Sequence, residues 1–250
     1  MKNELFSVGP ITIHGYGLMI AIGILVCIFM GTYRAKKRQL KEEAVLDIAI
    51  LSVIAGFAGA KLLFVLVEFD SFLEDPLRIL GSEGFVVYGG IIAGVLAAIL
   101  YCRRKKLSFL EYFDLLAPSI SVAQGFGRIG CFLAGCCYGK ETDAFWGVTF
   151  PEGSFAPAGI PLIPTQLLSS VGDFLIMSVL LIYGRHSKKT GNTGALYLLL
   201  YGVGRFFIEF LRSDDRGSVG LLSTSQFISI GIVLIALWIF YRNNEKNIRN

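Results

Sequence analysis

The run GYGLMIAIGILVCIFMGTY, residues 15–33, contains no charged side chain. An α-helix rises about 1.5 Å per residue, so about 20 apolar residues cross the hydrocarbon core of a bilayer. Comparable apolar runs follow at 45–67, 86–102, 113–136, 165–184, 195–211 and 224–241. The sequence therefore predicts an all-α integral membrane protein with about seven transmembrane helices.

The composition excludes an ordinary soluble globule. Of the 250 residues, 54% are hydrophobic and only 17% are charged, and the mean hydropathy is +0.64. A soluble chain of this size needs more charge to cover its surface. We expect residues 1–250 to form a single transmembrane domain with a small external cap around 138–164, which is the longest connection between apolar runs. The connection at 68–84 is expected to hold a short helix along the interface.

Basic residues gather in alternate connections between the apolar runs. One set comprises Arg34, Lys36, Lys37, Arg38, Lys41, Arg103, Arg104, Lys105, Lys106, Arg185, Lys188, Lys189, Arg242, Lys246 and Arg249, whereas the other connections hold only Lys2, Arg78, Lys140, Arg212 and Arg216. The positive-inside rule places the N-terminus outside and the C-terminus in the cytoplasm. Because the basic runs adjoin apolar spans, they are interpreted as orientation signals, and no nucleic-acid partner is expected. No small-residue cleavage pattern precedes the first run, so it is expected to stay in the membrane.

Ionisable groups inside the spans are candidates for function, because each is costly there unless it faces a cavity or a partner. They are Lys61, Arg128, Asp173, Arg205 and Glu209. On a helix, Arg205, Glu209 and Arg212 share one face, so the acid can pair with either arginine. A structural ion pair is one interpretation. The other is that arginines from two helices with a single internal acid leave surplus positive charge, which favours an anion such as a lipid phosphate.

The cysteines and histidines are few. An odd number of cysteines at irregular spacing argues against a disulfide scaffold, and two histidines, His14 and His186, make a four-ligand zinc site difficult to build, so no metal site is expected. Cys131, Cys136 and Cys137 have two interpretations: a thiol function, either as a covalent acceptor or as a redox pair, or small residues that fill space, which we favour. Cys27 and Cys102 are expected to be buried as small hydrophobes.

Two further patterns concern helix surfaces. Residues 125–130, GFGRIG, match the dinucleotide-binding pattern, but they follow an apolar helix and not a strand, so that interpretation is rejected. The glycines are instead expected to let a neighbouring helix or a lipid headgroup approach the backbone beside Arg128. Gln166, Ser169, Ser170 and Asp173 share one helix face, which lines either a helix contact or a substrate cavity.

Several short motifs, each present once, are spread over almost the whole chain. They are HGYG at 14–17, YGG at 88–90, GRIGCF at 127–132 continuing to YG at 138–139, PTQL at 164–167 and RFFIEFLR at 205–212, with Asp114 and Pro118 before the third. As a set they resemble the bacterial prolipoprotein diacylglyceryl transferases. The resemblance implies a multi-pass enzyme of the bacterial plasma membrane that moves the diacylglyceryl group of phosphatidylglycerol to the lipobox cysteine thiol of prolipoprotein signal peptides. Glycerol phosphate is released, no cofactor is implied, and membrane lipids surround the enzyme.

The resemblance also implies residue roles. Arg128 and Arg205 match the two key arginines of the family, which would hold the phosphate, and Glu209 would orient Arg205. Gln166 falls on the family's Pro-Ser-Gln element. The expected substrate-binding set is Arg128, Arg205, Glu209, Gln166, Tyr16, Gly127 and Gly130.

This sequence departs from the family pattern at several polar positions. Tyr88 stands where the family usually has a catalytic His, and a phenol is a poor base near neutrality. His14 is the only histidine expected near the outer face, so the expected catalytic set is Arg128, Arg205, Tyr88 and His14. Cys131 replaces the family's Asn, Cys136 its acidic residue, and IPTQLL at 163–168 its HPSQLY.

Three hypotheses remain. The favoured one is a transferase that uses Tyr88 or His14 for proton transfer. The second is a paralogue that keeps the phospholipid donor and uses a different acceptor. The third is a noncatalytic lipid-binding protein, in which Arg128 and Arg205 serve structural pairs.

Overall fold

The computed structural model describes residues 4–8, 11–82, 84–187, 189–214 and 217–248. Lys2, Lys188, Arg216 and Arg249, which entered the charge argument, lie outside these residues. The chain divides into two compact units, one formed by Met1–Gly31 and Phe113–Asn250, the other by Thr32–Tyr112. Each unit is described by itself below.

Seven long helices coincide closely with the apolar runs of the sequence. They are α1 (Gly15–Lys37), α2 (Glu42–Val67), α5 (Val87–Arg104), α6 (Phe109–Ala134), α7 (Thr165–His186), α8 (Asn192–Ile208) and α9 (Thr224–Ile248). Within the described residues, six of these helices, all but α6, are long and apolar enough to cross a bilayer. The expectation of an all-α integral membrane protein is confirmed, while the number of spans and their orientation stay predictions.

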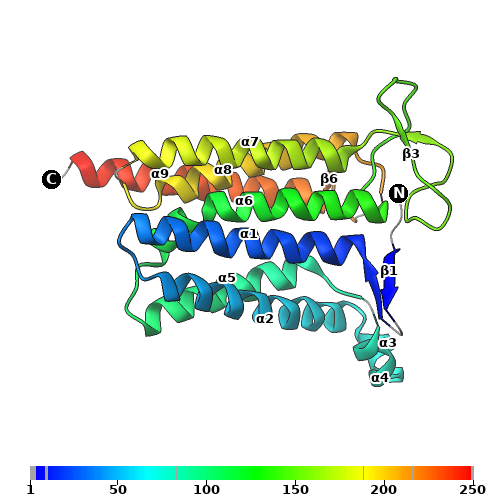
Figure 1. Ribbon diagram of the computed structural model, residues 1–250, viewed down its shortest axis with the longest axis horizontal. Helices are drawn as coiled ribbons and strands as arrows, with labels where there is room; N and C mark the ends of the chain where they lie inside the picture. Colours follow the sequence, from blue (N-terminus) through cyan, green and yellow to red (C-terminus); the bar gives the residue numbers. More distant parts are fainter. Residues whose placement is uncertain (1–3, 9–10, 83, 188, 215–216, 249–250) are drawn as a thin grey trace. The chain divides into compact units, whose positions relative to one another are not determined.

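In the unit of residues 32–112, α2 and α5 lie side by side (Figure 1). Glycines on both helices allow their close approach. A Cβ on Gly59 of α2 would lie 2.6 Å from the carbonyl oxygen of Gly89 of α5, so only glycine fits this crossing. Ser52 Oγ donates to Gly94 O at 3.1 Å, and the Tyr101 hydroxyl donates to Asp47 Oδ2 at 2.5 Å. Asp47 is an acid within the second apolar run that sequence analysis did not single out.

The connection after α2 contains two short helices, α3 (Phe69–Glu74) and α4 (Pro76–Gly81), where one was expected. Proline suits the first turn of α4 because it has no N–H to leave unsatisfied, and Asp75 caps that turn by accepting from Arg78 N at 3.0 Å. Lys61 donates to Ser82 O at 2.7 Å, and its ammonium lies over the rings of Phe64 and Phe85. This intramembrane cation therefore has structural partners.

In the larger unit, the core lies between α6, α7 and α8 and is centred on Ala117, Leu180 and Tyr197. The Asp114 carboxylate of α6 accepts from the backbone N–H groups of Gly191 at 2.5 Å and Gly194 at 2.6 Å. These N–H groups belong to the start of α8, whose positive dipole end favours an anion. Gly191 has φ +94°, a conformation that favours glycine. Asp114 thus fixes the start of α8 against α6.

The region of the expected cap, 138–164, contains the short antiparallel strands β3 (Val148–Thr149) and β4 (Pro161–Leu162). Its small core of Phe150, Ala156 and Leu162 packs against Phe132 near the end of α6. Lys140 N donates to Leu211 O at 2.9 Å, which joins the cap to the segment after α8. Among its described residues, the larger unit also contains two hairpins: β1 (Glu4–Val8) with β2 (Ile11–His14), and β5 (Ser218–Val219) with β6 (Leu222–Ser223).

Candidate functional site

A pocket lies between α6, α7 and α8 in the larger unit. Its volume is about 140 Å³, and it is lined by Arg128, Leu168, Ser169, Gly172, Asp173, Ile176, Tyr201, Gly204, Arg205 and Ile208. Sites that enclose whole small molecules are larger, roughly 300–1,000 Å³. The pocket is therefore the size of a polar headgroup and too small to enclose long acyl chains.

Arg205 is held in this pocket on one side only. Its Nη2 lies 2.7 Å from Glu209 Oε2 and donates to Ser225 Oγ of α9 at 2.8 Å. Its Nη1 is buried and has no hydrogen-bond partner among the described residues. An unsatisfied buried N–H is costly, so this side of the guanidinium favours an acceptor from a ligand.

Arg128 faces the same pocket from α6 and forms no ion pair among the described residues. It is close enough to Asp173 of α7 and Tyr201 of α8 for electrostatic interaction. Asp173 is buried, with 5% of its surface exposed. The sequence led us to expect that the two arginines share a single internal acid, Glu209. That expectation was wrong, because Asp173 is a second acid and lines this pocket. The site has surplus positive charge only when the Asp173 carboxyl carries a proton.

The polar face of α7 forms part of a helix contact and also part of the pocket, the two alternatives that the sequence left open. Ser169 and Asp173 line the pocket. Gln166 and Ser170 contact α6 and the turn that follows it: Gln166 Nε2 donates to Cys136 O in that turn at 2.8 Å, and Ser170 Oγ donates to Gly125 O of α6 at 3.0 Å. Gln166 is almost fully buried, and its Oε1 has no partner among the described residues.

The motif at 205–212 does not form one continuous helix. Helix α8 ends at Ile208, and Glu209–Leu211 form the 3₁₀ turn η1. Arg212 then has extended backbone and pairs with Asp214 through two contacts, Nε to Oδ1 at 2.9 Å and Nη2 to Oδ2 at 2.8 Å. The expectation that Arg212 shares a helix face with Glu209 was wrong, and Glu209 pairs with Arg205.

The two glycines beside Arg128 have different surroundings. A Cβ on Gly127 would meet nothing within 4 Å, whereas one on Gly130 would lie 3.1 Å from Tyr16 Cδ2. Gly130 therefore permits close packing of α1 on α6, and Gly127 faces open space. Tyr16 is close enough to Arg128 for electrostatic interaction. Residues 125–130 lie within α6, consistent with rejection of the dinucleotide pattern.

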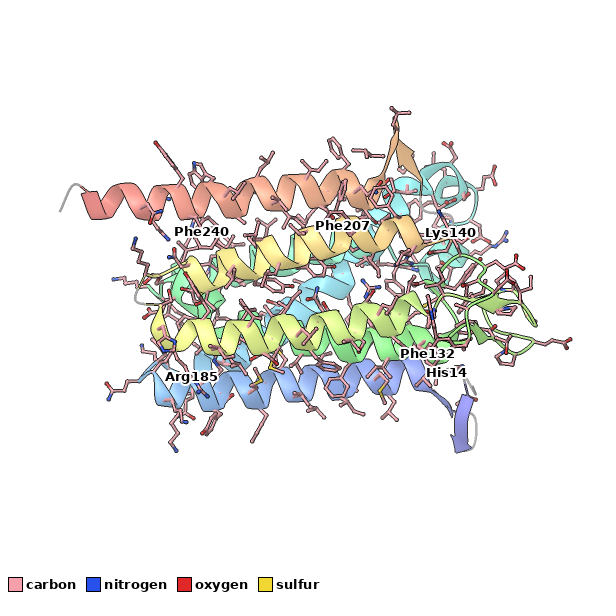
Figure 2. The ribbon with its side chains drawn as sticks, turned by 90° about the horizontal axis from the view of Figure 1, so that it is seen from above. His14, Phe132, Lys140, Arg185, Phe207 and Phe240 are labelled. Carbon is pink, nitrogen blue, oxygen red and sulfur yellow. The ribbon has the colours of Figure 1, made fainter. Side chains whose placement is uncertain are left out.

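The proposed proton-transfer residues belong to different units. Tyr88 lies in the first turn of α5, in the unit of residues 32–112. His14 ends β2 in the larger unit and is exposed. Figure 2 shows His14 at the same end of that unit as Phe132 and Lys140, with Arg185 and Phe240 at the opposite end. The catalytic roles of Tyr88 and His14 stay predictions.

Sequence reasoning missed Ser225 and Tyr201. A serine at the start of an apolar helix and a tyrosine on a helix facing the core are common, so neither carries a signal in the sequence. Only the structure places Ser225 against Arg205 and Tyr201 in the pocket wall.

Comparisons with known proteins cover nearly the whole chain. The family model described as "Prolipoprotein diacylglyceryl transferase" matches residues 3–242. The chain is 48% identical over 242 residues to the "Phosphatidylglycerol--prolipoprotein diacylglyceryl transferase" of Clostridium tetani (strain Massachusetts / E88), covering 96% of this chain and 97% of that protein.

Two further relatives carry the same description. "Phosphatidylglycerol--prolipoprotein diacylglyceryl transferase 2" of Clostridium perfringens (strain 13 / Type A) is 45% identical over 98% of this chain and 97% of its own length. The protein of Clostridioides difficile (strain 630) is 32% identical over 99% of each chain. The chain therefore belongs to the prolipoprotein diacylglyceryl transferase family.

Proposed function

We propose that this chain is a phosphatidylglycerol–prolipoprotein diacylglyceryl transferase. Relatives with 48% and 45% identity over nearly the full length are described by that activity. The observation that carries the proposal within the structure is the headgroup-sized pocket, where Arg128 has no ion pair and Arg205 has an unpartnered buried nitrogen among the described residues. A protein that binds a phosphodiester in a membrane needs donors of this kind.

In this proposal the phosphate of phosphatidylglycerol occupies the pocket. Arg205 Nη1 donates to one phosphate oxygen and Arg128 to another, while Glu209 and Ser225 hold the far side of the Arg205 guanidinium. The apolar side chains of Leu168, Ile176 and Ile208 lie at the same pocket and suit the glycerol backbone and the first acyl carbons. Asp173 disfavours the anion when ionised, so binding is linked to its protonation.

The chemical step is a displacement at carbon. The lipobox thiol loses its proton, its sulfur forms a bond to the diacylglyceryl carbon, and the bond from that carbon to the phosphate oxygen breaks with its electron pair on the oxygen. Glycerol phosphate leaves, and the two arginines stabilise the charge that develops on it. Only a thiolate is a good nucleophile, and Tyr88 and His14 are the proposed proton acceptors.

The plasma membrane is the proposed location, since the six apolar helices indicate a multi-pass membrane protein and phosphatidylglycerol is a membrane lipid. Prolipoprotein signal peptides with a lipobox cysteine are the proposed acceptors, as the names of the relatives include prolipoproteins.

The direct test is transfer itself. Purified protein in detergent is incubated with phosphatidylglycerol and a synthetic lipobox peptide, and mass spectrometry follows the peptide while released glycerol phosphate is assayed. We expect a diacylglyceryl peptide that is lost with Arg128→Gln and retained with Arg185→Gln, an exposed arginine at the other end of the same unit (Figure 2). Glycerol phosphate without modified peptide would show a different acceptor, and no turnover by folded, lipid-binding protein would show a noncatalytic role.

A further inference from the structure

Three cysteines at the end of α6 gather into one cluster. Cys131 lies in the last turn of α6, and Cys136 and Cys137 follow in the turn after the helix. Their three Sγ atoms all lie within 4.8 Å of one another. Cys131 is buried, while Cys136 and Cys137 are partly buried, and none of the three forms a disulfide. Spacing alone does not predict this cluster, because residues 131 and 136 are separated by more than one helical turn.

Neighbouring elements fix the backbone that carries the cluster. Thr165 Oγ1 donates to Cys137 O at 2.7 Å, and Gln166 Nε2 donates to Cys136 O at 2.8 Å. Thr165 and Gln166 are almost fully buried at the start of α7. Cys137 has φ +63°, which is uncommon for a residue with a side chain. The turn is thus held in a costly conformation that directs the third thiol toward the other two.

Three thiols that point toward one another can coordinate a soft metal ion. Thiolates select zinc-like d¹⁰ ions, with Zn–S distances of about 2.3 Å. Tetrahedral coordination at that distance separates the sulfurs by about 3.8 Å. The Sγ atoms already lie within 4.8 Å of one another, so each pair must approach by at most about 1 Å. The scarcity of histidines makes a site with four protein ligands difficult to build, but it does not exclude a site with three cysteine ligands.

We propose that Cys131, Cys136 and Cys137 bind one thiophilic divalent cation of the zinc class and leave one coordination position open. Binding breaks three S–H bonds, forms three metal–sulfur bonds and releases three protons to solvent. Among the described residues no fourth His, Cys, Asp or Glu joins the cluster, so the fourth ligand comes from outside the chain, as in zinc sites that keep an open position.

The charge of the surroundings favours a divalent ion. Three thiolates and one divalent cation carry a net charge of −1. The guanidinium of Arg128 is close enough to Cys131 and Cys137 for electrostatic interaction and offsets this charge. A monovalent ion would leave one further negative charge in a partly buried site, which is costly.

The test uses the full chain in detergent with a non-thiol reductant and no lipid or peptide, so its result is independent of the proposed transferase activity. Co²⁺ serves as the spectroscopic probe and Zn²⁺ as its competitor. We expect one Co²⁺ per chain with the ligand-field bands of tetrahedral thiolate coordination, which Zn²⁺ abolishes. Cys131→Ser, Cys136→Ser and Cys137→Ser should each weaken binding by at least about tenfold, whereas Cys27→Ser and Cys102→Ser should leave it unchanged.

A second measurement on the unmodified chain covers the case in which a serine variant fails to fold. Thiol alkylation is mapped by mass spectrometry with and without Zn²⁺, and Zn²⁺ should protect the three clustered cysteines but not Cys27 or Cys102. The proposal is overturned if no tetrahedral bands form, if the control variants lose binding equally, or if protection is uniform over all five cysteines. Adding a small thiol to the Co²⁺ form should shift its sulfur charge-transfer band, and an unchanged band would refute the open position.

Discussion

Ser225 Oγ accepts a hydrogen bond from Arg205 Nη2 at 2.8 Å and so connects α9 to the pocket between α6, α7 and α8. This contact and the ion pair to Glu209 lie on the same nitrogen of the guanidinium. The other terminal nitrogen, Nη1, is buried and has no hydrogen-bond partner among the described residues. Ser225 is a positioning residue for an arginine that we propose to bind the phosphate.

We expect Ser225→Ala to lower kcat/KM for phosphatidylglycerol by roughly tenfold. A hydrogen bond to a charged group contributes about 1.5–3 kcal/mol, and part of that loss is recovered by water. The matched control is Ser229→Ala, one turn along the same helix, whose hydroxyl donates to Ser225 O at 2.7 Å. Equal losses in the two variants would show that packing of α9, and not the contact to Arg205, is responsible.

Asp114→Asn should lower the apparent Tm of the purified protein. Asparagine offers one acceptor oxygen where the carboxylate accepts from two backbone N–H groups at the start of α8, and it loses the charge that the helix dipole favours. The expected cost is about 1–3 kcal/mol. Glu111→Gln in the first turn of α6 removes the same charge but keeps the Asp114 carboxylate and its two backbone partners, and it should leave Tm nearly unchanged.

Gly127 and Gly130 should respond differently to the same substitution. Gly127→Ala should fold with normal Tm, since its Cβ meets nothing within 4 Å, whereas Gly130→Ala should lower Tm by crowding Tyr16. Gly127→Leu then tests whether the open space admits lipid: we expect normal Tm with a raised KM for phosphatidylglycerol. An unchanged KM would remove Gly127 from the substrate-binding set.

Gly59→Ala should destabilise the unit of residues 32–112, because its Cβ would lie 2.6 Å from Gly89 O across the contact between α2 and α5. Overpacking of this kind costs about 1–3 kcal/mol. Gly56→Ala, one turn earlier on α2, places its Cβ at an ordinary 3.5 Å from Gly90 O. Thermal unfolding of both variants checks the prediction, which fails if they have equal Tm.

The apolar runs predicted the long helices well because a bilayer demands uninterrupted apolar segments, and this requirement is visible residue by residue. Contacts between helices were harder to predict. The face of Gln166, Ser169, Ser170 and Asp173 was recognised, but its division between a helix contact and a pocket depends on how α7 is rotated against α6.

Two local backbone features could not be predicted from the sequence. The 3₁₀ turn at Glu209–Leu211 separates Arg212 from the helix face that spacing had assigned to it. The positive φ of Cys137 and the turn after α6 place its thiol beside those of Cys131 and Cys136, a cluster that the spacing of the three cysteines does not predict. Both depend on the cap and the segment after α8, which pair through backbone hydrogen bonds between residues distant in the chain. Arg128, Arg205 and Asp173, which the sequence singled out as ionisable groups within the spans, line the pocket. They could be singled out because ionisable groups in apolar helices stand out.

The polarity of α6 has a consequence for how the protein enters the membrane. This helix carries Asp114 and Arg128 and, within the described residues, is not among the helices apolar enough to cross a bilayer unaided. Charged residues within a membrane helix oppose insertion by the translocon, by up to about 2.5–3.5 kcal/mol for a residue at the helix centre. A chain truncated after Ala134 lacks the α8 amides that bind Asp114. We therefore expect α6 to become stably inserted in the membrane only after α7 and α8 have been synthesised.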